Sequence, residues 1–60
     1  MNTYISAKEL QQEIGISYQS ALEIIKEVRK EMEKHGYLLP KGKELIAIKK
    51  LVYKRLGIEG

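Results

Sequence analysis

Residues 6–25, SAKELQQEIGISYQSALEII, hold two helix starts on either side of a single glycine. Ser6 and Glu9 are spaced as in a capping box, in which each side chain accepts a hydrogen bond from the other residue's backbone amide. Gly15 is expected to end the first helix, because glycine adopts the left-handed conformation without steric cost. Ser17, two positions later, is a favoured N-cap residue. The stretch therefore predicts a short helix, a tight turn and a second helix.

Apolar residues recur at helical spacing on both sides of this glycine. In the first segment they are Ala7, Leu10 and Ile14, and in the second Ala21, Ile25, Val28 and Met32. Such spacing gives each helix one apolar face. The second pattern runs until Gly36, which predicts a helix of about 18 residues. A short helix, a glycine turn and a capped second helix form the local pattern of a helix-turn-helix.

Two interpretations fit the residues after Gly36. Apolar runs at 37–39 and 45–48 flank a turn-forming PKGK sequence, which predicts a β-hairpin, or wing. Alternatively, one helix runs from Lys43 to Leu56, because its apolar residues also fit a helical period. We favour the hairpin, since no helix cap follows the proline. In either case a terminal helix is expected to end at Gly57.

The composition restricts the possible functions. The chain has 60 residues, no cysteine and one histidine, so it offers neither disulfides nor a thiolate metal site. A domain of this size has little room for an enclosed catalytic pocket. Because the sequence shows no nucleophile–base pair, phosphate-binding loop or metal-ligand spacing, we expect neither an enzyme nor a cofactor. The absence of a long apolar run or a leader pattern favours a cytoplasmic protein.

Positive charge is concentrated in the last third of the chain. Residues 41–60 contain six basic and two acidic residues, whereas residues 1–40 contain five basic and six acidic ones. The net charge of +3 therefore comes from the C-terminal third. Such an asymmetry favours a polyanionic partner such as DNA.

These features resemble the small winged helix-turn-helix proteins of the excisionase and MerR-like group, which phages and integrative elements encode near integrases. The resemblance covers nearly the whole chain. It is most specific at IGIS (14–17), A-x-x-I-I (21–25), M-x-x-x-G-Y (32–37) and LGI (56–58). It implies a mainly α fold in a single domain spanning residues 1–60, with a short helix, a long recognition helix, a hairpin wing and a C-terminal helix.

The resemblance also implies a function. Such a protein would be an excisionase, or recombination directionality factor, that binds double-stranded DNA at an attachment site, bends it and works with an integrase. One domain contacts little DNA, so selective binding would need further copies on adjacent sites or contact with the integrase.

The predicted base-reading residues lie on the outer face of the second helix, near its start, where a helix-turn-helix meets the major groove. Gln19 can form two hydrogen bonds with adenine, and Glu23 can accept one from the cytosine amino group. The alternative for both is a solvated side chain. A Glu23 carboxylate that faced the phosphates would oppose binding.

Other residues are predicted to contact the DNA backbone. On the second helix these are Ser17, Ser20, Lys26 and Lys30. Tyr18 is expected either to pack at the edge of the core or to contact DNA. Lys41 and Lys43 flank a glycine at the proposed wing tip, which suits contact with the backbone or the minor groove.

Two other functions remain open. A transcriptional regulator of a mobile element would carry the same residues. A helical protein-interaction module would instead use the apolar stripe of the second helix as a seam with a partner. Strongly salt-dependent affinity for duplex DNA would argue against such a module.

Overall fold

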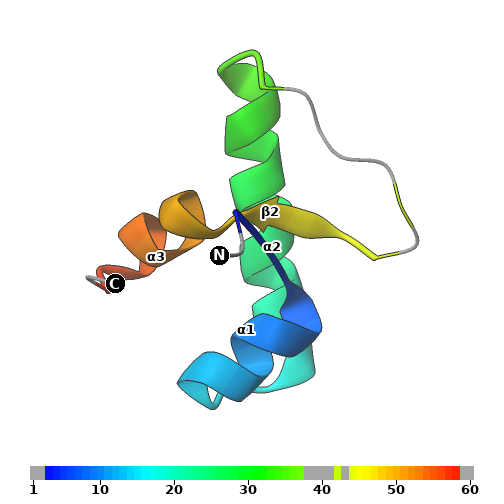
Figure 1. The fold of residues 1–60 in the computed structure, drawn as a ribbon, viewed down its shortest axis with the longest axis vertical. Helices are drawn as coiled ribbons and strands as arrows, with labels where there is room; N and C mark the ends of the chain where they lie inside the picture. The colour runs from blue at the N-terminus through cyan, green and yellow to red at the C-terminus, as the bar shows by residue number, and fades with distance from the viewer. Residues whose placement is uncertain (1–2, 38–41, 43, 59–60) are drawn as a thin grey trace.

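The computed structural model describes residues 3–37, 42 and 44–58. In chain order its elements are β1 (Tyr4–Ser6), α1 (Ala7–Ile14), α2 (Tyr18–Lys34), β2 (Ile46–Ile48) and α3 (Lys49–Leu56) (Figure 1). The chain is thus a small, mainly α domain whose described part has three helices and a two-stranded antiparallel sheet.

The turn between α1 and α2 forms as the sequence predicted. Ser6 Oγ accepts a 3.2 Å hydrogen bond from the Glu9 amide, and Glu9 Oε1 accepts one of 3.2 Å from the Ser6 amide. Gly15 has φ of 69°, and its N–H donates to the carbonyl of Gln11. Ser17 Oγ then accepts a hydrogen bond from the Ser20 amide and caps α2. Local side-chain chemistry therefore determines both ends of this turn.

The end of α2 is also confirmed. The helix has 17 residues, and Gly36 follows it with φ of 84°. The N–H of Tyr37 donates to the carbonyl of Met32 at 2.9 Å. This is the hydrogen bond of a Schellman motif that spans six residues. The last turns of α2 extend beyond the sheet and α1 (Figure 1).

The region before α3 needs one correction. Residues 46–48 form a strand, so the alternative of one helix from Lys43 to Leu56 is wrong. Within the described residues this strand pairs with β1, in the register Tyr4↔Ile48, Ile5↔Ala47 and Ser6↔Ile46, and the sequence analysis had not predicted β1. Of the predicted partner strand at 37–39 only Tyr37 is described, and it is not in a strand. Lys41 and Lys43 lie outside the described residues.

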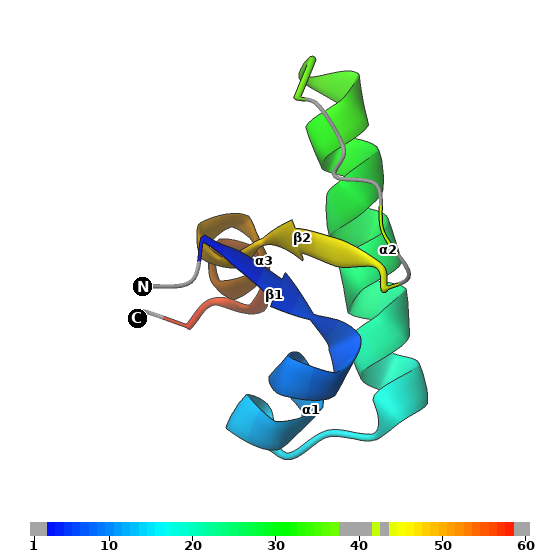
Figure 2. The ribbon, with the colours of Figure 1, turned by 45° about the vertical axis from the view of Figure 1, so that its right-hand side comes forward.

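The core draws on all five elements. Its fully buried members are Ile5, Ala7, Leu10, Ala21, Ile25, Val28, Met32, Ala47 and Val52. In Figure 2 the two strands lie side by side next to α2, and α1 packs against the N-terminal part of α2. The four core residues of α2 are at most 1% exposed, so the apolar stripe of α2 is used inside the domain. It is not available as a seam for a partner.

Candidate nucleic-acid interface

Two contacts identify the two sides of α2. Arg29 Nη1 donates a 2.7 Å hydrogen bond to the carbonyl oxygen of Ile46, which marks the side facing the sheet. On the opposite side, Arg55 Nη2 lies 3.0 Å from Glu27 Oε2, which marks the side facing α3. No local sequence pattern predicts either contact, because the partners are 17 and 28 positions apart.

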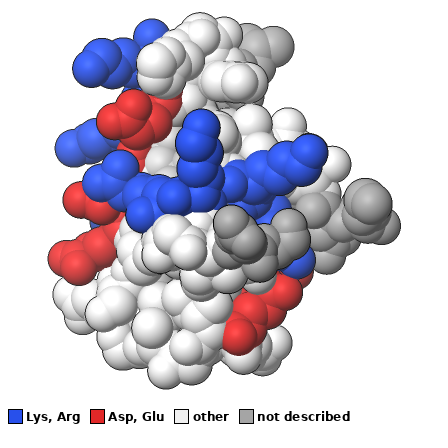
Figure 3. Space-filling model, turned by 90° about the vertical axis from the view of Figure 1, so that its left-hand side faces the viewer, with Lys and Arg blue, Asp and Glu red and all other residues white. Residues whose placement is uncertain are grey.

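Over residues 19–31 the exposed surface of α2 divides lengthwise between these sides, whereas in the last turn Glu33 lies on the sheet side and Lys34 among the acidic positions. At about 100° per residue, Gln19, Lys26 and Lys30 line the sheet side and the outermost edge, and we call them the sheet-side row. A second row consists of Glu23, Glu27 and Glu31, and we call it the acidic row. Glu23 lies at the outermost edge, and each later residue of the row lies closer to α3. All six residues are exposed. Figure 3 shows acidic side chains interleaved with Lys and Arg along one edge of the α3 face, and a band of Lys and Arg across its middle.

The N-terminal end of α2 is open to solvent. Ser17 Oγ donates a 2.9 Å hydrogen bond to Ser20 Oγ while it accepts from the Ser20 amide, and both serines are exposed. The first turn consists of uncharged residues, Tyr18–Ser20. The positive end of the helix dipole is therefore not neutralised by an acidic residue in its own first turn, which favours an anion there.

A small depression adjoins this end of α2 on the sheet side. Its volume is about 200 Å³, and it is lined by Ser6, Ala7, Lys8, Tyr18, Leu22, Glu44 and Leu45. Tyr18 is 52% exposed and Leu45 is 37% exposed. Tyr18 therefore lines a depression of mixed polar and apolar character and is accessible. The sequence analysis did not identify Lys8 or Leu45 as neighbours of Tyr18, because no local pattern places α1 and the segment before β2 beside α2.

The structure brings most of the predicted site residues onto one element. The exposed ones, all on α2 or its cap, are Ser17, Tyr18, Gln19, Ser20, Glu23, Lys26 and Lys30. Lys41 and Lys43 belong to the segment that is not described. Accessibility makes contact with DNA possible, and the DNA-binding roles themselves stay predictions.

A cluster of three side chains joins α1 to α3. Glu13 Oε1 lies 3.1 Å from Lys49 Nζ, and Glu13 Oε2 accepts a 2.7 Å hydrogen bond from the Tyr53 hydroxyl. Lys49 Nζ also lies 5.5 Å from the centroid of the Tyr53 ring.

The same contacts perturb the titration of all three groups. The hydrogen bond from Tyr53 is the largest cause of a lowered pKa at Glu13, and the hydrogen bond from Lys49 is the next largest. The hydrogen bond to Glu13 raises the pKa of Lys49, and likewise that of Tyr53. All three groups are solvent-accessible, so the cluster orients α1 on α3 without a buried charge.

The described residues contain no cluster of three or more His, Cys, Asp or Glu side chains that could hold a metal ion. Nor does that part of the chain contain a helix long and apolar enough to cross a membrane.

Comparison of the chain with family models, curated proteins and solved structures gave no match. The resemblance to the excisionase and MerR-like group therefore rests on the sequence motifs quoted above.

Proposed function

We propose that this chain is a non-catalytic, sequence-specific double-stranded DNA-binding protein with a winged helix-turn-helix arrangement, in which α2 is the recognition helix. One observation carries the proposal. The Gly15 turn holds α2 so that its apolar stripe is buried while its capped N-terminal end is exposed. A helix-turn-helix uses this end of its second helix to reach base edges.

The charges on α2 indicate which side meets the duplex. Glu27 and Glu31 lie toward α3, where they would repel the phosphates of a bound duplex. The sheet-side row carries two lysines and one glutamine. DNA therefore approaches α2 from the sheet side and the outermost edge. Lys26 and Lys30 neutralise phosphates, while Gln19 and the outermost Glu23 read bases.

The wing would act from the same side. Because Arg29 binds the carbonyl of Ile46, the start of β2 is held against the sheet side of α2. The segment that leads into β2 contains Lys41 and Lys43. We assign this segment as the wing and its lysines as backbone or minor-groove contacts.

The biological role follows from the resemblance. We infer an excisionase, or recombination directionality factor, that bends attachment-site DNA and acts with an integrase. A transcriptional regulator of a mobile element is the second candidate, and the two differ in where the protein binds. A footprint over an attachment site indicates excision, and one over a promoter indicates regulation.

Binding to labelled duplexes tiled across the protein's own genetic neighbourhood, at two salt concentrations, tests the proposal. We expect one tile to bind tightly, and that affinity to fall as salt rises. Lys26→Ala should weaken binding and lower the salt slope by about one, whereas Lys50→Ala, the same change on α3, should do neither. Equal, feeble binding to every tile would refute the proposal.

A further inference from the structure

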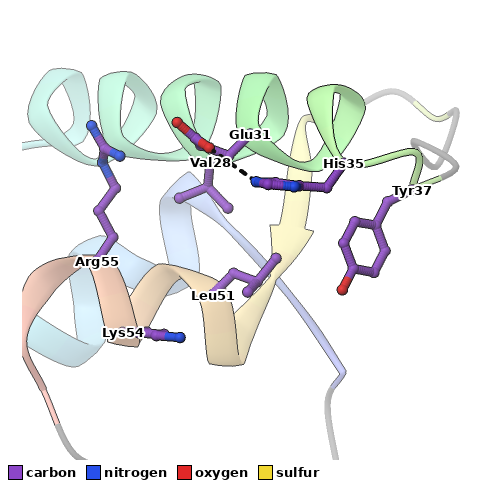
Figure 4. Close-up of a pocket in the computed structure, with 7 residues that line it drawn as sticks. All are labelled: Val28, Glu31, His35, Tyr37, Leu51, Lys54 and Arg55. Atoms are coloured by element: carbon purple, nitrogen blue, oxygen red, sulfur yellow. Dashed lines mark ion pairs between the residues drawn. The ribbon is translucent and has the colours of Figure 1, made fainter.

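A groove separates α2 from α3 on the face away from the sheet-side row. Its volume is about 430 Å³, and we call it the α2–α3 groove. Val28 and Leu51 point toward each other between the two helices and form an apolar floor (Figure 4). Tyr37, which is 50% exposed, lies at one end of the groove. The face therefore combines an apolar floor with an accessible aromatic ring.

The two rims of this groove carry opposite charges. Glu27 and Glu31 lie on the α2 rim, and Lys54 and Arg55 lie on the α3 rim. One ion pair, Arg55 with Glu27, joins the rims, and its side chains are 42% and 56% exposed. Among the described residues, Glu31 has one ion-pair partner, His35 of its own helix at 3.6 Å, and Lys54 has none. The rims thus present two acidic and two basic side chains to solvent in separate rows.

This segregation selects the kind of partner that fits. A polyanion or a uniformly acidic peptide would be attracted by the α3 rim and repelled by the α2 rim, and a basic partner would meet the reverse. A fitting partner has an acidic row and a basic row in opposite order around an apolar centre. A second copy of this chain has both rows, and a two-fold axis along the groove reverses their order.

We propose that the α2–α3 groove is a self-association surface, on which two copies pair with the acidic rim of each facing the basic rim of the other. The pairing covers Leu51 and Tyr37 above the buried Val28, and it leaves the sheet-side row of both copies exposed. Surface ion pairs are weak and screened by salt, so the dimer is weak and dissociates as salt rises. The inference goes beyond the proposed function and is tested without DNA.

Sedimentation equilibrium of the whole chain, from low micromolar to roughly millimolar concentration at low and high salt, measures the association. Two variants test the charge pattern. Lys54→Glu with Arg55→Glu makes both rims acidic, and Glu27→Lys with Glu31→Lys makes both rims basic. We expect each variant alone to associate at least about tenfold more weakly than the wild type. An equimolar mixture of the two should form a heterodimer.

A matched control distinguishes an effect of charges on this face from an effect of net charge. Lys26→Glu with Lys30→Glu changes the net charge as much as the acidic-rim variant does, but on the sheet side, and it should associate as the wild type does. Circular dichroism establishes that each variant is folded. Should a charge reversal unfold the chain, concentration-dependent NMR shifts in the wild type give a second measurement. They should concentrate at Tyr37 and Leu51 rather than at Gln19.

Several results would overturn the proposal. These are a wild type that stays monomeric at low salt, charge-reversed variants that associate normally, a mixture that forms no heterodimer, or shifts outside the groove. None of them bears on DNA binding by α2, which the tiled duplexes test separately.

Discussion

Arg29 reaches across 17 positions of sequence to donate a 2.7 Å hydrogen bond from Nη1 to the backbone carbonyl oxygen of Ile46. The Arg29 side chain is half-buried, and Ile46 is the first residue of β2. This bond joins the proposed recognition helix to the strand that follows the proposed wing. It therefore holds the start of β2 against α2.

Replacing Arg29 with methionine keeps a long apolar stem and removes the donor. Because the Ile46 carbonyl then loses a charge-assisted partner, we expect a loss of about 1–3 kcal/mol in the free energy of unfolding. Denaturant titration measures it. The neighbouring change Lys30→Met removes the same charge from an exposed position and should leave the midpoint nearly unchanged. Equal midpoints for the two variants would show that the bond to Ile46 contributes nothing.

Gly15→Val is expected to cost about 1–3 kcal/mol of stability, because a β-branched residue resists positive φ. A Cβ built at Gly15 meets nothing within 4 Å, so backbone strain at φ of 69° is the whole cause. Thermal melting checks this, with two controls. Gly15→Asn should retain most of the stability, since asparagine tolerates this conformation. Gly42→Val, at a glycine without positive φ, should melt as the wild type does. An unchanged melting temperature for Gly15→Val would contradict the prediction.

The elements that were predicted correctly are those whose signals are local. The Ser6–Glu9 capping box, the Gly15 turn, the Ser17 cap and the closing Gly57 each depend on residues within a few positions of one another. The apolar stripe of α2 was also predicted, because a 17-residue helix repeats its period several times.

The contacts that were missed join distant residues. The β1–β2 pairing has only three residues on each side, too few for alternation to identify a strand. Glu13 meets Lys49 and Tyr53 across 36 and 40 positions. At the candidate site, the exposed residues of α2 were predictable from helical period. Which side of α2 faces the sheet was not, because Arg29 determines it through a backbone carbonyl that carries no side-chain signal.

The cluster of Glu13, Lys49 and Tyr53 should make stability depend on pH at both extremes. The pKa of Glu13 is lowered from its ordinary 4.5, so its contribution is present above that pH and is lost as pH falls through the lowered pKa. The pKa values of Tyr53 and Lys49 are raised from 10.0 and 10.5, so their contributions are present below those values and are lost as pH rises through the raised pKa values. Denaturation midpoints measured across pH should therefore decline in both windows.

Tyr53→Phe isolates the largest cause of the Glu13 shift. Because the hydroxyl no longer donates to the carboxylate, we expect the pKa of Glu13 to rise toward its ordinary value, while the bond with Lys49 keeps part of the shift. NMR titration of the Glu13 carboxyl carbon measures this directly. Tyr18→Phe, which removes a hydroxyl from the depression beside α2 rather than from the Glu13 cluster, is the control. An unchanged Glu13 titration in Tyr53→Phe would mean that the 2.7 Å contact does not persist in solution.

Substitutions of base-reading and phosphate-contacting residues on α2 should affect DNA binding differently. The first should change the preference for particular base pairs, and the second should change the dependence of affinity on salt. Gln19→Ala removes a side chain able to bond adenine, so it should reduce the preference for an A·T pair at one position by about 1–3 kcal/mol without changing the salt slope. Glu23→Ala should instead reduce the preference for a C·G pair at another position. Lys26→Ala should weaken binding to all duplexes alike and lower the salt slope by about one. Affinities for a set of duplexes that each differ by one base pair, measured at two salt concentrations, check all three.

Gln12→Ala, at an exposed glutamine of α1, should change neither quantity. If Gln19→Ala and Glu23→Ala leave every preference intact while Lys26→Ala still weakens binding, then α2 contacts only the DNA backbone. Sequence selection would then depend on residues outside this helix.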